Sequence, residues 1–165
     1  MQSLNRPTAC SLAQANSGTF KDQTFTIVTK ETAVSLQDGA REVVNYLIFV
    51  DEAVIKDKIT GSTSFAAEFA EQGPGDKKGR SLRQLDLSGR LMRYWCSYMI
   101  YSKQFDGLPG VAKDAVYRRT WAILSGQVRD RKYSRLSVAD RLAIVEILRD
   151  TKPDLQVSFK AESVK

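Results

Sequence analysis

Basic and aromatic side chains alternate in a short stretch near residue 130, where they could contact a negatively charged ligand. The residues concerned are Arg129, Arg131, Lys132, Tyr133 and Arg135. Arginine and lysine neutralise phosphates, and a tyrosine ring can stack on an exposed base. The stretch is therefore our candidate for anion or nucleic-acid contacts. No helix-turn-helix, RNP or KH motif accompanies it, and a solvated linker would have the same composition.

The absence of histidine limits the catalytic chemistry that the chain can support. Ser-His-Asp and Cys-His sites, histidine-containing zinc sites and histidine proton shuttles are excluded. Two cysteines, Cys10 and Cys96, cannot complete a thiolate zinc site, and two free thiols are favoured over a bridge between them. Cys96 would need Arg90 or Arg93 to lower its pKa before it could act as a nucleophile, so an inert core thiol is the favoured interpretation.

Carboxylate and phosphate-binding patterns in the sequence do not form a recognisable site. Asp51 and Glu52 are adjacent, and adjacent acids on a helix point in different directions, so we interpret them as a polar helix end. The loop GPGDKKGRS, residues 73–81, has Arg80 where a P-loop has lysine, and its outer glycines are too far apart. We therefore expect a flexible, solvated connector there. No catalytic residue, cofactor site or metal site is predicted.

The net charge of +6 is unevenly distributed along the 165 residues. Acidic residues outnumber basic ones from 38 to 71, whereas basic residues predominate from 76 to 103 and again from 113 to 135. Such asymmetry points to a nucleic acid, an anionic surface or an acidic partner. Solvated helix faces that are neutralised within the same domain would give the same pattern, so both interpretations stay open at this point.

Hydrophobic periodicity indicates a mainly α protein in which four to five helices surround a central apolar helix. The central helix is predicted over 89–102, within the stretch RLMRYWCSYMIYSK, which is apolar on nearly every side. The other helices are predicted over 37–51, 64–72, 108–125 and 137–152. The β-branched residues around 24–29 favour one short strand.

The same periodicity assigns side chains to the core and to the surface. The residues expected in the core are Phe65, Phe69, Val111, Ala115, Val116, Ile123, Leu124, Val138, Leu142, Val145 and Leu148. Arg118 and Arg119 should face water. Ser137 and Asp140 should cap the last helix, because a serine three residues before an acid can satisfy the first backbone N–H groups.

A single helical domain is expected over 36–152. Residues 1–35 are typical of a disordered or loosely attached leader, and 153–165 of a frayed tail. The chain has no apolar run long enough to span a membrane, and its first residues lack the apolar part of a signal peptide. As it stands, the chain is predicted to be cytoplasmic. The oligomeric state is left open.

Three segments carry a resemblance to a known group of proteins. They are YLIFVDEAVI (46–55), GRSLRQLDLSGRLMRYWCSYMIYSKQFDGLP (79–109) and LSVADRLAIVEILRDTKPDL (136–155). They resemble the C-terminal part of large uncharacterised bacterial proteins that often carry export signals, although a proline tends to stand there at the position of Trp95. The resemblance implies a periplasmic or envelope location for a chain that is a fragment or truncated relative. It assigns no catalytic residues.

The leading functional prediction is a non-enzymatic helical interaction module, the C-terminal piece of a bacterial envelope protein, whose partner is an unknown protein or an acidic surface. The alternative is a small basic nucleic-acid-binding protein that uses the cluster from Arg129 to Arg135. An enzyme with carboxylate or lysine chemistry ranks third, because no constellation of residues points to one.

Overall fold

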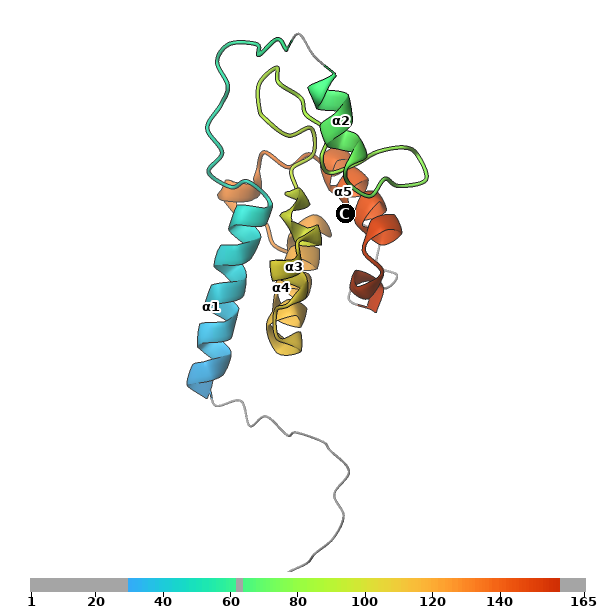
Figure 1. Cartoon of the computed structure of the whole chain (residues 1–165). Coiled ribbons are helices and arrows are strands. Elements are labelled where there is room, and N and C mark those ends of the chain that lie inside the picture. Colours follow the sequence, from blue (N-terminus) through green and yellow to red (C-terminus); the bar gives the residue numbers. More distant parts are fainter. Residues whose placement is uncertain (1–29, 62–63, 158–165) are drawn as a thin grey trace, which may run out of the picture.

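The computed structural model describes residues 30–61 and 64–157, and this part of the chain is mainly helical (Figure 1). Its α-helices are α1 (Lys30–Leu47), α2 (Phe65–Glu71), α3 (Lys103–Asp106), α4 (Gly110–Leu124) and α5 (Val138–Thr151). Short 3₁₀ turns cover Tyr98–Tyr101, Arg131–Tyr133 and Pro153–Val157. The predicted mainly α class is confirmed. The strand predicted near 24–29 lies outside the described residues.

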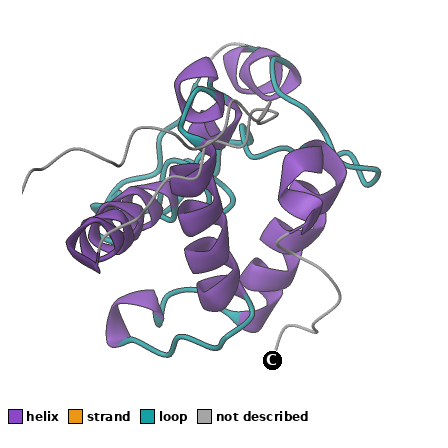
Figure 2. Cartoon of the chain, turned by 90° about the horizontal axis from the view of Figure 1, so that it is seen from below, coloured by secondary structure: helices purple, strands orange, loops and turns teal. Residues whose placement is uncertain are grey.

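Helices α1, α4 and α5 form the frame of the domain. α1 packs along α4, and α4 packs in turn against α5, while long loops make the other connections (Figures 1 and 2). Each of these helices contributes fully buried apolar residues, each of which stabilises the fold by about 1.5 to 3 kcal/mol. They include Val44 on α1, Val116, Ile123 and Leu124 on α4, and Ile144, Val145, Ile147 and Leu148 on α5.

The apolar stretch around Cys96 lies in the core, but it does not form the helix predicted over 89–102. Up to residue 97 the backbone is extended or turned, and the 3₁₀ turn over Tyr98–Tyr101 follows. Cys96 and Ile100 are at most 1% exposed. The predicted burial of the stretch is confirmed, and its predicted helical conformation is wrong.

Hydrogen bonds explain why this stretch leaves the helical conformation. A turn joins Leu85 to Met92 in an antiparallel bridge, with Leu87 in the left-handed region at φ 60°. The backbone N–H of Ser97 donates to the carbonyl oxygen of Leu47 at 2.7 Å, which fastens the stretch to the end of α1. In a helix this N–H would donate to a carbonyl oxygen four residues earlier. The hydrogen bond to Leu47 therefore overrides the helical preference of the local sequence.

Helix α1 begins and ends earlier than predicted, and its C-terminus is closed by a Schellman motif. The N–H groups of Phe49 and Val50 donate to the carbonyl oxygens of Tyr46 at 3.2 Å and Asn45 at 3.0 Å. Phe49 has a φ of 53°, a left-handed conformation that glycine usually supplies. Because phenylalanine takes this position in place of glycine, the sequence gives no visible signal that the helix ends here.

Some apolar side chains that were assigned to the core face solvent instead. Phe65, Val111, Val138 and Leu142 are all more than 40% exposed. On α5 the predicted core residues Val145 and Leu148 are buried, whereas Val138 and Leu142 are exposed and Ile144 and Ile147 are buried in addition. The periodicity therefore located the helix and half of its predicted stripe correctly, and the buried face is turned toward Ile144 and Ile147.

The ends of α5 lie where the sequence predicts them, but the chain after α5 is not the frayed tail that was expected. The hydroxyl of Ser137 accepts a hydrogen bond from the backbone N–H of Asp140 at 3.1 Å, and the Asp140 carboxylate accepts from the N–H of Ser137 at 3.2 Å. The predicted cap is confirmed. Leu155 is fully buried, although it lies in the tail predicted to fray.

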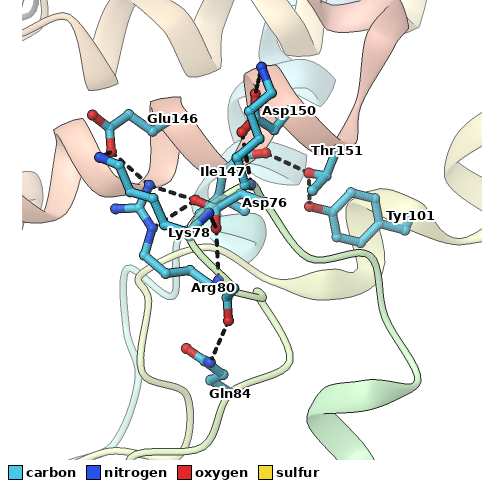
Figure 3. A network of polar contacts seen from close by, with 11 residues as sticks. Asp76, Lys78, Arg80, Gln84, Tyr101, Glu146, Ile147, Asp150 and Thr151 are labelled. Atoms are coloured by element: carbon cyan, nitrogen blue, oxygen red, sulfur yellow. Dashed lines mark hydrogen bonds and ion pairs between the residues drawn. The ribbon is translucent and has the colours of Figure 1, made fainter.

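The loop over 73–81 is fastened to α5, so the predicted flexible connector is wrong (Figure 3). The Asp76 carboxylate, 1% exposed, accepts hydrogen bonds from the backbone N–H groups of Lys78 and Arg80 and from Arg80 Nε. Arg80 Nη2 and Lys78 Nζ reach Glu146 of α5 at 2.6 and 2.8 Å. We call Asp76, Lys78, Arg80 and Glu146 the loop clamp.

The loop clamp holds both of its carboxyl groups in the anionic form. Burial alone would raise the pKa of Asp76, but hydrogen bonds from Arg80 and from the Lys78 backbone outweigh burial and lower that pKa below its ordinary value. Hydrogen bonds from Lys78 and Arg80 likewise lower the pKa of Glu146. A buried carboxylate is tolerated because its oxygens are paired in this way.

We expect Asp76→Asn to lower the free energy of unfolding by about 2 to 3 kcal/mol, because Arg80 would keep its charge beside a neutral buried partner. Urea unfolding followed by circular dichroism measures the loss. Lys77→Ala is the matched control, since Lys77 is 88% exposed and its ion pair with Asp150 is 3.5 Å long. The control should change the free energy by less than about 0.5 kcal/mol. Equal losses in the two variants would show that the loop is not clamped.

The lowered pKa values of Asp76 and Glu146 also predict how stability depends on pH. Their folded pKa values lie below the unfolded ones, so the stabilisation is complete above about pH 5 and is lost as pH falls through the folded values. We expect the free energy of unfolding to fall below about pH 4, and to fall less steeply in Asp76→Asn. Urea midpoints measured across this range would contradict the prediction if both proteins lost stability equally.

Candidate anion-binding site

The turn between α4 and α5 carries all five residues predicted as anion contacts. In the structure these residues line two separate spaces. Arg129, Arg131 and Tyr133 line a cavity of about 520 Å³ beside the end of α4 and the start of α5. Lys132 and Arg135 line a much smaller depression, with Tyr133 at the boundary of both. We call the larger space the first arginine cavity.

Positive charge dominates the first arginine cavity. Its charged lining residues are Arg129, Asp130, Arg131 and Arg141, which together carry a net charge of +2. The Asp130 carboxylate accepts a hydrogen bond from the N–H of Lys132 at 3.3 Å and lies 3.9 Å from its Nζ. Within the described part of the chain, none of the three arginines is ion-paired with Asp130, so their charge is not neutralised locally.

Arg141 projects from α5 and was not among the residues predicted from the sequence. It lies four residues after the capping Ser137, so the capped first turn of the helix fixes its position. Its Nε atom is buried and has no hydrogen-bond partner among the residues that the structure describes. A buried donor without an acceptor costs about 1 to 3 kcal/mol. The positive charge of the guanidinium still contributes to the potential of the cavity that Arg141 lines.

Local backbone contacts hold the other two arginines beside the cavity. Gly126, at φ 80°, reverses the chain after α4, and its carbonyl oxygen accepts a hydrogen bond from Arg129 Nε at 3.4 Å. Asp130 then caps the 3₁₀ turn that begins with Arg131. The positions of the arginines are therefore set by the turn rather than by contacts between them.

Tyr133 joins the turn to α1 and α4. Its hydroxyl donates to Asn45 Oδ1 at 2.9 Å and accepts from Arg119 Nη2 at 3.3 Å. Tyr133 is 7% exposed, so the structure places its ring in the core instead of offering it to a base. Arg119 is half-buried by the same contact, contrary to the expectation that it faces water.

Lys132 and Arg135 line the smaller depression and are not part of the first arginine cavity. Arg135 Nη1 donates to the carbonyl oxygen of Glu52 at 3.1 Å, and its guanidinium lies 6.0 Å from the Trp95 ring. The guanidinium of Arg90 lies closer to the same ring, at 4.2 Å. These contacts tie the turn to the segment after α1, so Arg135 has a structural role in the domain.

Cys96 lies in the core, as the sequence suggested. Burial raises the pKa of the Cys96 thiol to about 12, which leaves it protonated at neutral pH and agrees with an inert core thiol. Cys10 lies outside the described residues. Within 30–61 and 64–157, no group of three or more acidic or cysteine side chains is placed to hold a metal ion. In the same residues, no helix has the length and apolar character needed to cross a membrane.

The acidic residues after α1 lie in a separate cavity of about 430 Å³. It is lined by Glu42, Asp51 and Glu52 together with the exposed ring of Tyr46. Asp51 and Glu52 follow the Schellman motif and are not part of α1, so the predicted polar helix end is a loop. The structure thus brings an acidic cavity close to the arginines of the turn.

Comparisons with protein-family models, with curated proteins and with solved structures gave no match. The resemblance to large exported bacterial proteins therefore stays a prediction, and so do the fragment origin and the compartment that it implies.

We expect Tyr133→Phe to lower the free energy of unfolding by about 1 kcal/mol, because Asn45 and Arg119 would both lose a hydrogen-bond partner. Thermal unfolding at neutral pH measures the change. Tyr46→Phe removes the same atom from a side chain that is 82% exposed, and it should leave stability unchanged. A Tyr133→Phe protein as stable as the Tyr46→Phe control would contradict the linking role of Tyr133.

Proposed function

We propose that the protein is a non-enzymatic helical interaction module that binds an anionic group of its partner in the first arginine cavity. The observation that carries the proposal is the grouping of Arg129, Arg131 and Arg141 on the wall of one cavity with a single acid, Asp130, which is engaged by Lys132. An oxoanion bound there would accept hydrogen bonds from the guanidinium groups that line the cavity. It would also reduce the repulsion among three guanidinium groups.

The lining of the cavity supports an oxoanion attached to a larger partner. Arginine offers a planar fork of donors that matches phosphate, sulfate and carboxylate groups in a bidentate manner. The remaining wall includes apolar residues such as Ile123, Val128 and Leu136. A cavity of about 520 Å³ is larger than one oxoanion requires, so apolar parts of the partner would fill the rest.

The chemistry of the described side chains supports binding over catalysis. The carboxylates with lowered pKa values, Asp76 and Glu146, are engaged in the loop clamp. The Cys96 thiol is buried and protonated. A guanidinium group is a hydrogen-bond donor without an acceptor, which suits the binding of an anion better than general acid–base catalysis.

We expect inorganic phosphate to bind saturably in the first arginine cavity. In a nuclear magnetic resonance titration at constant ionic strength, the Nε–H signals of Arg129, Arg131 and Arg141 should shift together. Arg141→Gln should weaken phosphate binding about tenfold or more, since a hydrogen bond to a charged group contributes about 1.5 to 3 kcal/mol.

Arg93→Gln is the control for the phosphate titration, because it removes one positive charge from an exposed arginine outside the cavity. It should leave the affinity for phosphate unchanged. If both variants lost affinity equally, or if the signals shifted without saturation, binding would reflect net charge and the proposed site would be wrong.

A further inference from the structure

The small depression beside the turn lies between the first arginine cavity and the acidic cavity after α1. Phe49 and Val50 line both the depression and the acidic cavity, and Tyr133 and Leu136 line both the depression and the arginine cavity. The hydroxyl of Tyr133 also donates to Oδ1 of Asn45, a residue of the acidic cavity, at 2.9 Å. A positive and a negative cavity are therefore neighbours on one chain.

The opposite charges of these two cavities do not neutralise each other. The acidic cavity is lined by Glu42, Asp51 and Glu52 and by no basic residue, so its net charge is −3, whereas the first arginine cavity carries +2. Glu42 and Asp51 are exposed, and neither forms an ion pair within the described part of the chain. Charges of both signs are therefore available to a partner.

A second arginine-lined cavity of about 490 Å³, between α1 and α4, extends the positive surface. Arg41, Arg118 and Arg119 line this second arginine cavity, together with Asp38, which pairs with Arg41 at 3.1 Å. Arg119 Nη2 donates to the hydroxyl of Tyr133, a residue of the first cavity, at 3.3 Å. The positive surface thus includes both arginine cavities, and the acidic cavity borders it.

The neighbouring acidic cavity restricts which anionic partner can reach the arginines. A nucleic acid or a uniformly acidic protein would be attracted by the first arginine cavity and repelled by Glu42, Asp51 and Glu52 beside it. A second copy of the chain carries both charges at the same spacing. A two-fold rotation then places each acidic cavity opposite the arginine cavity of the other copy.

Apolar side chains lie between the two charged cavities. Phe49, Val50 and Trp95 line the small depression, and all three are half-buried, so part of each remains open to solvent. A protein interface typically has an apolar centre with charged and polar groups at its rim. The order of acidic cavity, apolar depression and arginine cavity gives that arrangement to two copies that meet at the depression.

We infer that the partner is a second copy of the same chain, and that Glu42 and Asp51 of each copy supply the carboxylates that bind in the first arginine cavity of the other. This inference rests on the proposed function and names its partner. Carboxylates match the bidentate donors of arginine. The same two surfaces meet twice about the two-fold axis, so the contact closes at a dimer.

Sedimentation velocity across a range of protein concentrations tests the inference. We expect the wild-type chain to form dimers as its concentration rises, and the dimer to weaken as salt screens the charges. Arg131→Glu and Glu42→Arg should each weaken dimerisation about tenfold or more, because each brings like charges together. Both side chains are exposed, so the variants should keep the circular dichroism spectrum of the wild type.

An equimolar mixture of Arg131→Glu and Glu42→Arg gives the sharpest test. In a mixed dimer the two reversed residues face each other and the two unaltered surfaces face each other, so the mixture should dimerise about as tightly as the wild type. Arg93→Glu and Glu71→Arg are the matched controls, because they reverse exposed charges outside the cavities and should not change dimerisation. A mixture that stays monomeric, or controls that lose as much affinity, would overturn the inference.

Inorganic phosphate separates failure of this inference from failure of the proposed function. At constant ionic strength phosphate should dissociate the dimer, because both ligands need the same arginines. If phosphate binds saturably while the wild-type chain stays monomeric, the first cavity binds anions and the second copy is wrong. Saturable binding of polyglutamate by that monomer would identify an acidic protein as the partner. If phosphate does not bind saturably and the chain stays monomeric, the proposed function fails as well.

Discussion

The buried carboxylate of Asp76 is the interaction on which the arrangement of α5 and its basic surroundings depends. It turns the loop over 73–81 back on itself through backbone hydrogen bonds, and it directs Arg80 and Lys78 toward Glu146. A buried carboxylate is stable when its oxygens are all engaged, so the loop and helix α5 must keep this relation. Arg141 lies on the same helix, in the first turns that follow the Ser137 cap.

The loop clamp and the ion pair of Lys77 with Asp150 neutralise part of the first basic stretch, from 76 to 103. Lys77, Lys78 and Arg80 belong to the first stretch and are paired with acids of α5 or with Asp76. The second stretch, from 113 to 135, has no comparable set of acids in the described structure, and its arginines line two cavities. The charge asymmetry of the sequence therefore has two causes. The positive charges of Lys77, Lys78 and Arg80 are neutralised within the domain, whereas arginines of the second stretch carry positive charge at cavity walls.

Sequence reasoning located the ends of α4 and α5, where local signals are sufficient, although it assigned some of their exposed side chains to the core. The Ser137 and Asp140 cap and the stop at Gly126 depend on neighbouring residues, and both appear as expected. Sequence reasoning failed around Cys96 because the Ser97 N–H donates a hydrogen bond to the carbonyl oxygen of Leu47, a residue far away in the chain. Apolar periodicity shows that a stretch is buried, but a long-range hydrogen bond can replace the helix that the pattern suggests.

The distinction between local signals and long-range packing applies also to the arginines that line the cavities. Arg129 and Arg131 could be found because they are contiguous in the sequence, whereas Arg141 and Arg119 join the cavities through the packing of α5 and α1 on α4. Both late additions carry a buried Nε atom without a partner in the described residues. Such a donor lowers the stability of the free protein, and an anion that binds the folded state offsets this loss. Stability and binding are therefore opposed at these two residues: an acid placed beside either arginine would stabilise the fold and would neutralise the charge that attracts a ligand.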